Sequence, residues 1–352
     1  MFHYFYYDGV LTFQNKVYEN ICILVYLHLK LITMEILQKP VYIFPGDIHP
    51  NADLIKEQTT AWICSNYLFL EDHMQKKYKY SDFGYFTARC LPHQPYESLL
   101  PCTRFMLWAT VFDDYYEYCT AEKLSLLRER ITAIFNGDAV HEKEHFFLHE
   151  AAVIRDELSA LMPDIWMKRF IKSFDAYMES MLFEIPYKIP DYFPTLDEFF
   201  ALREITIGIQ AFIDLIEFQT KEILPDSIYY SSFFRDLYTL TARISAWCND
   251  FYSIRKDLDR EPLNLVLVLK HHYKLSLEKA NEEALRLHND DVQQLINLQQ
   301  NIPDFGEYTE TVRQFAFYLG VMIQGQSQWY SKDTRRYLEG GHPDLHTFKN
   351  IP

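Results

Sequence analysis

Apolar side chains recur at three- and four-residue spacing through most of this chain, and that period limits its possible folds more than any other feature. Such spacing places apolar residues on one face of an α-helix, whereas a strand would alternate them. Strand-like alternation is nearly absent from the sequence. The period predicts helices over residues 52–75, 97–119, 121–135, 141–161, 164–183, 195–219, 228–258, 276–300 and 307–337. We therefore expect an all-α fold.

Composition agrees with long helices in a single domain. Only 10 of the 352 residues are glycine, well below the usual share of about 7%. Sheet-rich folds use glycine at turns and bulges, so its scarcity favours helices. Neither an internal repeat nor a low-complexity linker interrupts residues 35–352, which we expect to form one helical bundle with a central cavity. Turn signals separate the predicted helices at Pro92 and Pro95, at Asn136-Gly137-Asp138, and at Pro186, Pro190, Pro225 and Pro303.

The first 34 residues differ from the rest of the chain. The apolar run Ile21–Leu29 is shorter than the ~20 residues that span a bilayer. A basic n-region and a small-residue cleavage site are both missing, so a secretory signal is not expected. Met34 then opens a segment that resembles an ordinary cytosolic start. We expect residues 1–34 to be an upstream extension of uncertain status, with a membrane-touching helix as the alternative and no stable membrane insertion.

The charge of the chain limits its partners. The formal net charge is −15, which argues against a nucleic acid or an anionic membrane surface as the binding partner. Six cysteines are scattered without a C-x-x-C pair, so a reduced, cytoplasmic protein is the simpler interpretation. They are Cys22, Cys64, Cys90, Cys102, Cys119 and Cys248.

An acidic motif lies late in the second predicted helix, at Asp113-Asp114-Tyr115-Tyr116-Glu117. Asp113 and Glu117 are four residues apart, so both project from one helix face. Two carboxylates at that spacing repel unless cations neutralise them, and Mg²⁺ is commonly held by one or two carboxylates plus substrate phosphates. A solvated acidic helix end is the alternative. The apolar residues 108–112 that precede the motif make that alternative weaker.

A second polar row lies in the helix predicted over 228–258. Asn249, Ser253 and Asp257 stand at i, i+4 and i+8, which aligns three oxygen donors along about two turns. An amide, a hydroxyl and a carboxylate suit one Mg²⁺ whose other ligands are phosphate and water. Lys256 could meet the same phosphate. These side chains could also face solvent, but the apolar residues 246–248 before them indicate a buried segment, where polar groups need partners.

The two motifs together resemble a known pattern. Asp113-Asp114-x-x-Glu117 followed by Asn249-Asp250-x-x-Ser253-x-x-x-Asp257 is similar to the paired metal motifs of class I terpene synthases. The match looks nearest to the microbial type, including the set from social amoebae. In that family the two motifs lie on facing helices. The separation of 136 residues between Asp113 and Asn249 is similar to the separation in the family. The resemblance covers roughly residues 85–340.

Four further features support the resemblance. Arg203 stands 46 residues before Asn249, where family members carry a diphosphate-sensing arginine, and Gly208 suits the family's helix break. Arg336-Tyr337 matches a C-terminal pair that binds diphosphate, and the segment 264–266 also looks like the family. There are departures. Glu117 replaces an aspartate, Ala109 and Thr110 replace aromatic residues, and either Trp329 or Tyr330 could be the pocket aromatic.

The resemblance implies a function and a site. The protein would use Mg²⁺, as three ions with Mn²⁺ as a substitute, to ionise a prenyl diphosphate and direct the resulting carbocation. Farnesyl diphosphate is expected, with geranylgeranyl diphosphate as the alternative; the product and a possible homodimer stay open. The implied metal ligands are Asp113, Asp114, Glu117, Asn249, Ser253 and Asp257. The implied substrate-binding residues are Arg203, Lys256, Arg336, Tyr337, Phe105, Phe212 and Trp329. Asp250 is expected to have a structural role.

Other functions must be weighed. His141-Glu142-Lys143-Glu144-His145 fits H-E-x-x-H, a zinc metallopeptidase pattern, in which two histidines on one helix face bind the ion. The charged middle residues favour an exposed helix start instead. Chain elongation would need a second aspartate-rich motif where Asn249 stands, and the D-x-D-D motif of protonation-initiated cyclisation is missing. A non-enzymatic helical interaction protein remains the alternative from a different class.

Overall fold

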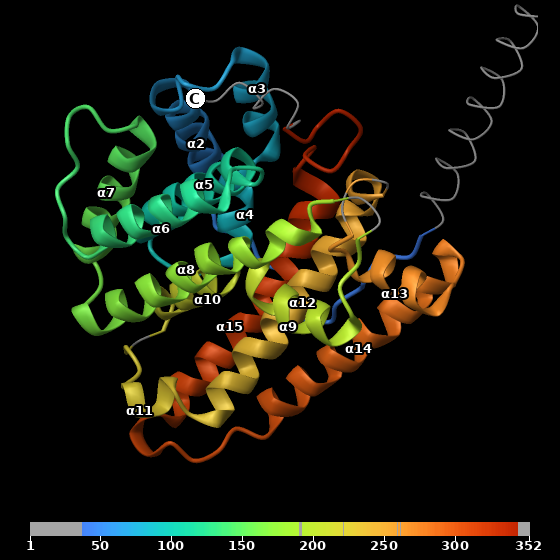
Figure 1. Cartoon of the computed structure of the whole chain (residues 1–352). Helices are drawn as coiled ribbons and strands as arrows, with labels where there is room; N and C mark the ends of the chain where they lie inside the picture. Colours follow the sequence, from blue (N-terminus) through green and yellow to red (C-terminus); the bar gives the residue numbers. More distant parts are fainter. Residues whose placement is uncertain (1–36, 190–191, 221, 259, 261, 344–352) are drawn as a thin grey trace, which may run out of the picture.

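The computed structural model describes residues 37–189, 192–220, 222–258, 260 and 262–343, and all regular structure in these ranges is helical (Figure 1). The predicted extension over residues 1–34 lies outside them. The α-helices are α2 (Ala52–Asn66), α3 (Asp72–Ser81), α4 (Phe83–Cys90), α5 (Tyr96–Tyr116), α6 (Ala121–Phe135), α7 (Phe146–Ser159), α8 (Asp164–Glu184), α9 (Leu196–Thr206), α10 (Gln210–Asp214), α11 (Asp226–Tyr229), α12 (Ser232–Asp257), α13 (Leu265–Tyr273), α14 (Leu277–Gln300) and α15 (Thr309–Gln328). Short helical turns cover Ile185–Tyr187, Leu215–Phe218 and Gly306–Tyr308, and a π-helical turn, η4, covers Trp329–Asp333.

Six helices form a closed ring in the middle of the molecule. Going around it, α5 packs on α4, α4 on α15, α15 on α12, α12 on α9, and α9 on α8. Aromatic contacts between α8 and α5 complete the ring, since the Phe105 ring meets Phe170 and Phe174 at centroid distances of 4.8 and 5.3 Å. The remaining helices, such as α2, α7 and α14, lie outside this ring in Figure 1.

The helix faces that point away from the ring centre build the core. On α5, the Trp108 ring stacks on Phe147 of α7 at 4.6 Å, and its indole N–H donates to the Phe147 carbonyl at 3.0 Å. On α12, the Trp247 ring stacks on Phe199 of α9 at 5.8 Å. Burial of side chains of this size supplies most of the stability of such a bundle. The ring of helices is therefore held both by an outer helix and by contacts between its own members, which leaves its inner faces free to line a cavity.

The helix boundaries differ from the predicted ones at several places. The predicted range 52–75 is two helices with a turn after Asn66, and 195–219 breaks after Thr206, where Gly208 has a φ of +70°. Within the predicted range 307–337, α15 ends at Gln328 and η4 follows it. Helices α4 and α13 were not expected; they are short, with 8 and 9 residues. The all-α prediction itself is confirmed.

Candidate active site

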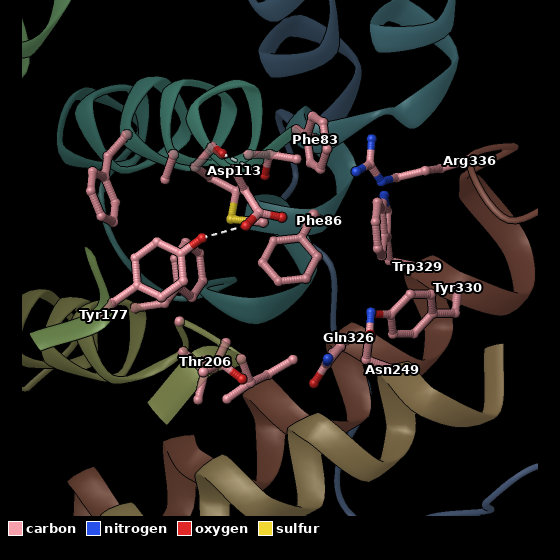
Figure 2. Close-up of a pocket in the computed structure, with 18 of the residues that line it drawn as sticks. Phe83, Phe86, Asp113, Tyr177, Thr206, Asn249, Gln326, Trp329, Tyr330 and Arg336 are labelled. Atoms are coloured by element: carbon pink, nitrogen blue, oxygen red, sulfur yellow. Dashed lines mark hydrogen bonds between the residues drawn. The ribbon is translucent and has the colours of Figure 1, made fainter. Parts of the chain in front are cut away.

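A cavity of about 180 Å³ lies inside the ring, and aromatic and aliphatic side chains make up most of its wall (Figure 2). Each ring helix contributes to it, from Phe83 and Phe86 on α4 to Gln326 on α15. The predicted aromatics Phe105, Phe212 and Trp329 all line it, and so does Tyr330. Further lining residues are Met106, Ala109, Thr110, Phe174, Tyr177, Thr206, Ile207, Gly208 and Ile209.

A polar pocket of about 100 Å³ adjoins this cavity. Both predicted oxygen rows reach it, since Asp113 from α5 and Asp257 from α12 line the same pocket. Its lining residues are Asp113, Asp114, Glu117, Glu184, Lys188, Arg203, Thr206, Asn249, Ser253, Lys256, Asp257, Leu263, Arg336, Tyr337 and His342. Asp113, Arg203, Thr206, Asn249, Arg336 and Tyr337 line both spaces. All the predicted metal ligands and phosphate-binding residues are thus brought together.

The acidic motif on α5 is already hydrogen-bonded. Tyr177 of α8 donates its hydroxyl to Asp113 Oδ1 at 2.7 Å. Burial, together with the neighbouring Asp114 carboxylate, raises the pKa of Asp113. Asp114 accepts from the Tyr78 hydroxyl at 2.8 Å and pairs with Arg336. The neighbouring carboxylates of Asp113 and Asp114 at this helix end favour the binding of positive charge.

The second row lies on the last turns of α12. Ser253 Oγ donates to Asp257 Oδ2 at 2.5 Å, and Asn264 Nδ2 donates to the same oxygen at 3.0 Å. The other oxygen, Asp257 Oδ1, is buried without a hydrogen-bond partner among the described residues, although Lys256 Nζ lies 3.3 Å away. Asn264 also caps α13, accepting from Val266 N at 3.0 Å. It therefore holds the end of α12 against the start of α13.

Arg203 from α9 is fixed against the start of this second row. Its guanidinium donates to Asp250 Oδ1 at 2.7 Å and to Asn249 Oδ1 at 3.0 Å. Burial lowers the pKa of Arg203, but the Asp250 carboxylate outweighs that effect and the net shift is upward. Asp250 also accepts the backbone N–H of Leu265 at 2.8 Å. Asp250 has the structural role expected of it, since it anchors a helix, a cap and an arginine.

The C-terminal aromatics meet the same row. Asn249 Nδ2 donates to the hydroxyls of Tyr330 and Tyr337, at 2.7 and 3.1 Å. Trp329 instead donates its indole N–H to the Ser81 carbonyl at 2.9 Å, and its ring meets Phe86 edge-on at 5.0 Å. The sequence left open whether Trp329 or Tyr330 is the pocket aromatic. Both line the cavity. Trp329 contributes an apolar face, and Tyr330 contributes a hydroxyl close to the polar pocket.

Two residues that motif spacing did not predict are central to this arrangement. Tyr177 holds Asp113, and its ring lies so close to Gly208 that a Cβ there would come within 2.9 Å of two ring carbons. Lys188 pairs with Glu117 at 3.0 Å and with Glu184 at 3.4 Å. In the sequence, Tyr177 is one of 26 tyrosines at an ordinary helical position, so nothing marked it as functional.

The residues fit a divalent cation such as Mg²⁺. The pocket offers carboxylate, amide and hydroxyl oxygens, the ligand type that such hard cations require. Asp257 Oδ1 is buried there, with an ion pair to Lys256 but no hydrogen bond from the described residues. In the described part of the chain, no three His, Cys, Asp or Glu side chains converge closely enough to hold an ion. A bound ion would therefore also need Asn249, Ser253 and phosphate oxygens.

The zinc interpretation of His141 and His145 is wrong. Helix α7 begins only at Phe146, and His145 precedes it as the cap, accepting from Phe147 N at 3.2 Å. Glu144 turns away to Arg130, at 2.6 Å. Because His141 and His145 are not on a helix, the i, i+4 geometry that would aim both rings at one ion does not form.

Fold and site together define a class. A helical bundle in which two oxygen rows share a polar pocket next to an apolar cavity is the arrangement of the class I terpene synthases. Comparisons with known proteins agree. The sequence profile described as "Terpene synthase family 2, C-terminal metal binding" matches residues 104–294, more than half of the chain. The chain therefore belongs to this terpene synthase family, and it is a class I terpene synthase.

Characterised relatives cover most of the chain. Germacrene A synthase of Nostoc punctiforme is 25% identical over 87% of this chain and 96% of its own length. A (+)-T-muurolol synthase of Roseiflexus castenholzii, named as cyclising (2E,6E)-farnesyl diphosphate, is 26% identical over 84% of this chain and 92% of its own.

Solved structures share the fold. The SVS_A2 protein from ancestral sequence reconstruction superposes with a TM-score of 0.74 at 20% identity, covering 84% of this chain and 90% of its own. Hedycaryol synthase in complex with HEPES has a TM-score of 0.73 at 17% identity, with coverage of 84% and 98%. In the described residues, no helix is both long and apolar enough to cross a membrane.

Proposed function

We propose that this protein ionises farnesyl diphosphate in the presence of Mg²⁺ and converts the carbocation into a sesquiterpene and diphosphate. One observation carries the proposal: Asp113 and Asp257 line one polar pocket that adjoins an apolar cavity. Relatives named as sesquiterpene synthases support the fifteen-carbon substrate. Geranylgeranyl diphosphate is the alternative substrate.

Six side chains would hold the metal, which we propose to be three Mg²⁺ ions. Asp113, with Asp114 and Glu117, supplies the ligands on α5, while Asn249, Ser253 and Asp257 supply those on α12. The ions, when bound, provide Lewis-acid stabilisation of the charge that develops on the leaving diphosphate. Asn264 and Tyr177 position Asp257 and Asp113 for this task.

Four further side chains bind the diphosphate in this proposal. Arg203, Lys256, Arg336 and Tyr337 all line the polar pocket. Arg336 is 5% exposed, and its Nη1 has no hydrogen-bond partner among the described residues. A buried guanidinium nitrogen with an unused N–H is well suited to a phosphate oxygen. These cations compensate the substrate charge locally, although the whole chain is acidic.

The cavity then receives the prenyl chain. Its aromatic wall keeps bulk water from the carbocation and presents ring faces that stabilise positive charge. The rings of Phe105, Phe212 and Trp329 line it, and each could contribute about 2 kcal/mol as a desolvated cation–π contact. The edge-on packing of Phe86 against both Phe212 and Trp329 fixes two of these rings.

The test is a product assay with ten-, fifteen- and twenty-carbon prenyl diphosphates and Mg²⁺, with gas chromatography of a solvent overlay. We expect metal-dependent sesquiterpenes from the fifteen-carbon substrate. Asp113→Ala and Asn249→Ala should abolish them. Asp236→Ala is the control, because Asp236 is exposed on α12 away from both pockets. Release of prenyl alcohol or hydrocarbon only from the twenty-carbon substrate would favour the diterpene alternative, and absence of any product would reject the proposal.

Three narrower predictions accompany this function. Residues 35–352 form the catalytic unit, so a chain started at Met34 should retain full activity. The scattered cysteines favour a cytoplasmic location, which fractionation would check. A homodimer is one possible assembly, which sedimentation would check. Kinship with the social-amoeba enzymes rests on the motif spacing alone.

A further inference from the structure

Two buried polar side chains interrupt the apolar wall of the cavity. Gln326 of α15 is 4% exposed and Thr206 at the end of α9 is 8% exposed, and both line the cavity. Gln326 donates its amide nitrogen to the Ser245 carbonyl at 3.2 Å. Its Oε1 and the Thr206 Oγ1 have no hydrogen-bond partner among the described residues. Figure 2 shows both side chains at the same edge of the cavity.

Gln326 Oε1 and Thr206 Oγ1 both need a hydrogen-bond partner. A buried amide oxygen without a partner is costly, and an apolar prenyl chain cannot relieve that cost. A water molecule can, if the site has room and two or more polar partners. The cavity of about 180 Å³ has the room. Gln326 Oε1 accepts a hydrogen bond, and the Thr206 hydroxyl can donate or accept one.

The residue that accepts the Gln326 amide is also incompletely hydrogen-bonded. Ser245, whose carbonyl receives the Gln326 amide, has a buried Oγ that also finds no partner in the described part of the chain. Thr206 lines the polar pocket as well as the cavity. A water bound to Gln326 would lie in the cavity proposed for the prenyl chain, and Thr206 lines both that cavity and the pocket proposed for diphosphate.

We propose that Gln326 retains one water molecule in the cavity and that this water ends the reaction, so that the main product is a sesquiterpene alcohol. This rests on the proposed function. The water oxygen forms a C–O bond with the final tertiary or allylic carbocation, and one of its protons leaves to the released diphosphate. Farnesyl diphosphate and water thus give an alcohol and protonated diphosphate, with no change in oxidation state. Thr206 lies between the two spaces and can relay the proton.

The reaction products distinguish this role of Gln326 from a different one. If the amide served only as a dipole that stabilises an intermediate cation, its removal would change which hydrocarbon forms without changing the oxygen content of the products. If the amide holds the attacking water, its removal lets the same cation lose a proton instead, and hydrocarbons replace the alcohol. The oxygen content of the products therefore separates the two roles.

The experiment uses the full chain, farnesyl diphosphate, Mg²⁺ and ¹⁸O-labelled water, with mass spectrometry of extracted products. We expect a labelled sesquiterpene alcohol from the wild type. Gln326→Leu keeps the volume but removes the acceptor, and the ratio of alcohol to hydrocarbon should fall about tenfold, as expected for the loss of one hydrogen bond to the reacting water. Thr206→Val should lower the same ratio and serves as the second variant if Gln326→Leu does not fold.

Gln324→Leu is the matched control. Gln324 lies on the same helix and also has a buried Oε1 without a partner among the described residues, but it does not line the cavity. Its alcohol ratio should equal that of the wild type. A wild type that makes only hydrocarbons, or a Gln326→Leu variant that keeps the wild-type ratio, would overturn the inference and leave the synthase function intact. No product from any prenyl diphosphate would reject both.

Discussion

Arg336 and Asp114 form a buried ion pair, with Nη2 and Oδ1 2.5 Å apart, that joins the C-terminal segment to the acidic end of α5 across 222 positions of sequence. Tyr78 completes the arrangement by donating to the other Asp114 oxygen. A residue proposed to bind phosphate and a residue proposed to bind metal thus hold each other in place. Replacing one member of such a pair lowers the stability of the protein, because the remaining charge would be buried without compensation.

The first prediction tests this pair. Arg336→Met should lower the free energy of unfolding by about 3–5 kcal/mol, because it strands the Asp114 carboxylate. Adding Asp114→Leu should recover most of that loss and leave synthase activity absent. Urea denaturation measures the stability of each variant. Arg335→Met is the control, since Arg335 is the exposed neighbour. Equal stability losses for the two single arginine variants would contradict the buried pair.

The second prediction concerns the hydroxyl that holds Asp113. Tyr177→Phe removes the 2.7 Å hydrogen bond to Asp113 Oδ1 and keeps the ring. We expect the Mg²⁺ concentration for half-maximal activity to rise about tenfold, the lower end of what loss of such a supporting contact costs. A titration of activity against Mg²⁺ measures it. Tyr230→Phe, at an exposed tyrosine, should leave the titration unchanged. An unaltered midpoint in Tyr177→Phe would show that this contact is only structural.

The third prediction separates backbone strain from a clash at the helix break. Gly208 and Gly306 have similar φ angles, +70° and +63°, so alanine should cost about 1–2 kcal/mol of stability at each. Only at Gly208 would the new Cβ meet the Tyr177 ring, at 2.9 Å. Gly208→Ala should therefore also disturb Asp113 and reduce kcat at least about tenfold. Gly306→Ala should keep its activity. Thermal unfolding and steady-state kinetics of both variants compare the two effects.

The fourth prediction is a pH dependence of stability. Burial lowers the pKa of His288 to about 4, although a hydrogen bond to Asn289 opposes the shift. The Tyr42 hydroxyl lies 2.7 Å from its Nε2. The unfolded chain therefore binds a proton near pH 6.5 while the folded protein does not, so stability falls as the pH drops from about 6.5 to 4.

His288→Gln should remove this contribution, which amounts to about 3 kcal/mol over the whole window. Denaturation at a series of pH values, with the variant subtracted from the wild type, isolates it from the titrating carboxylates. His73→Gln, at an exposed histidine, should keep the wild-type slope. Parallel curves for wild type and His288→Gln would contradict the assignment.

Much of the site was predictable because its ligands are local in sequence. Asn249, Ser253 and Asp257 are aligned by the helical repeat alone, and Asp113 and Glu117 are likewise one turn apart. Arg203 was located by its separation of 46 residues from Asn249, and Arg336 by its match to the family's C-terminal Arg-Tyr pair. The positioning residues were not predictable in this way. Tyr177 and Gln326 reach the site from helices whose apolar period is the same whether a face meets the core or the cavity.

By itself, the sequence determined the helices and the order of the chemically active residues along them, because both depend on interactions within a few turns. Only the tertiary structure decided that Asp113 and Asp257 share a pocket and that Gly208 lies against Tyr177. It also decided that the amide oxygen of Gln326, at the apolar cavity, has no hydrogen-bond partner in the part of the chain that the structure describes. Those facts depend on how six helices close into a ring. That closure is a property of packing among distant segments, which no local pattern of residues encodes.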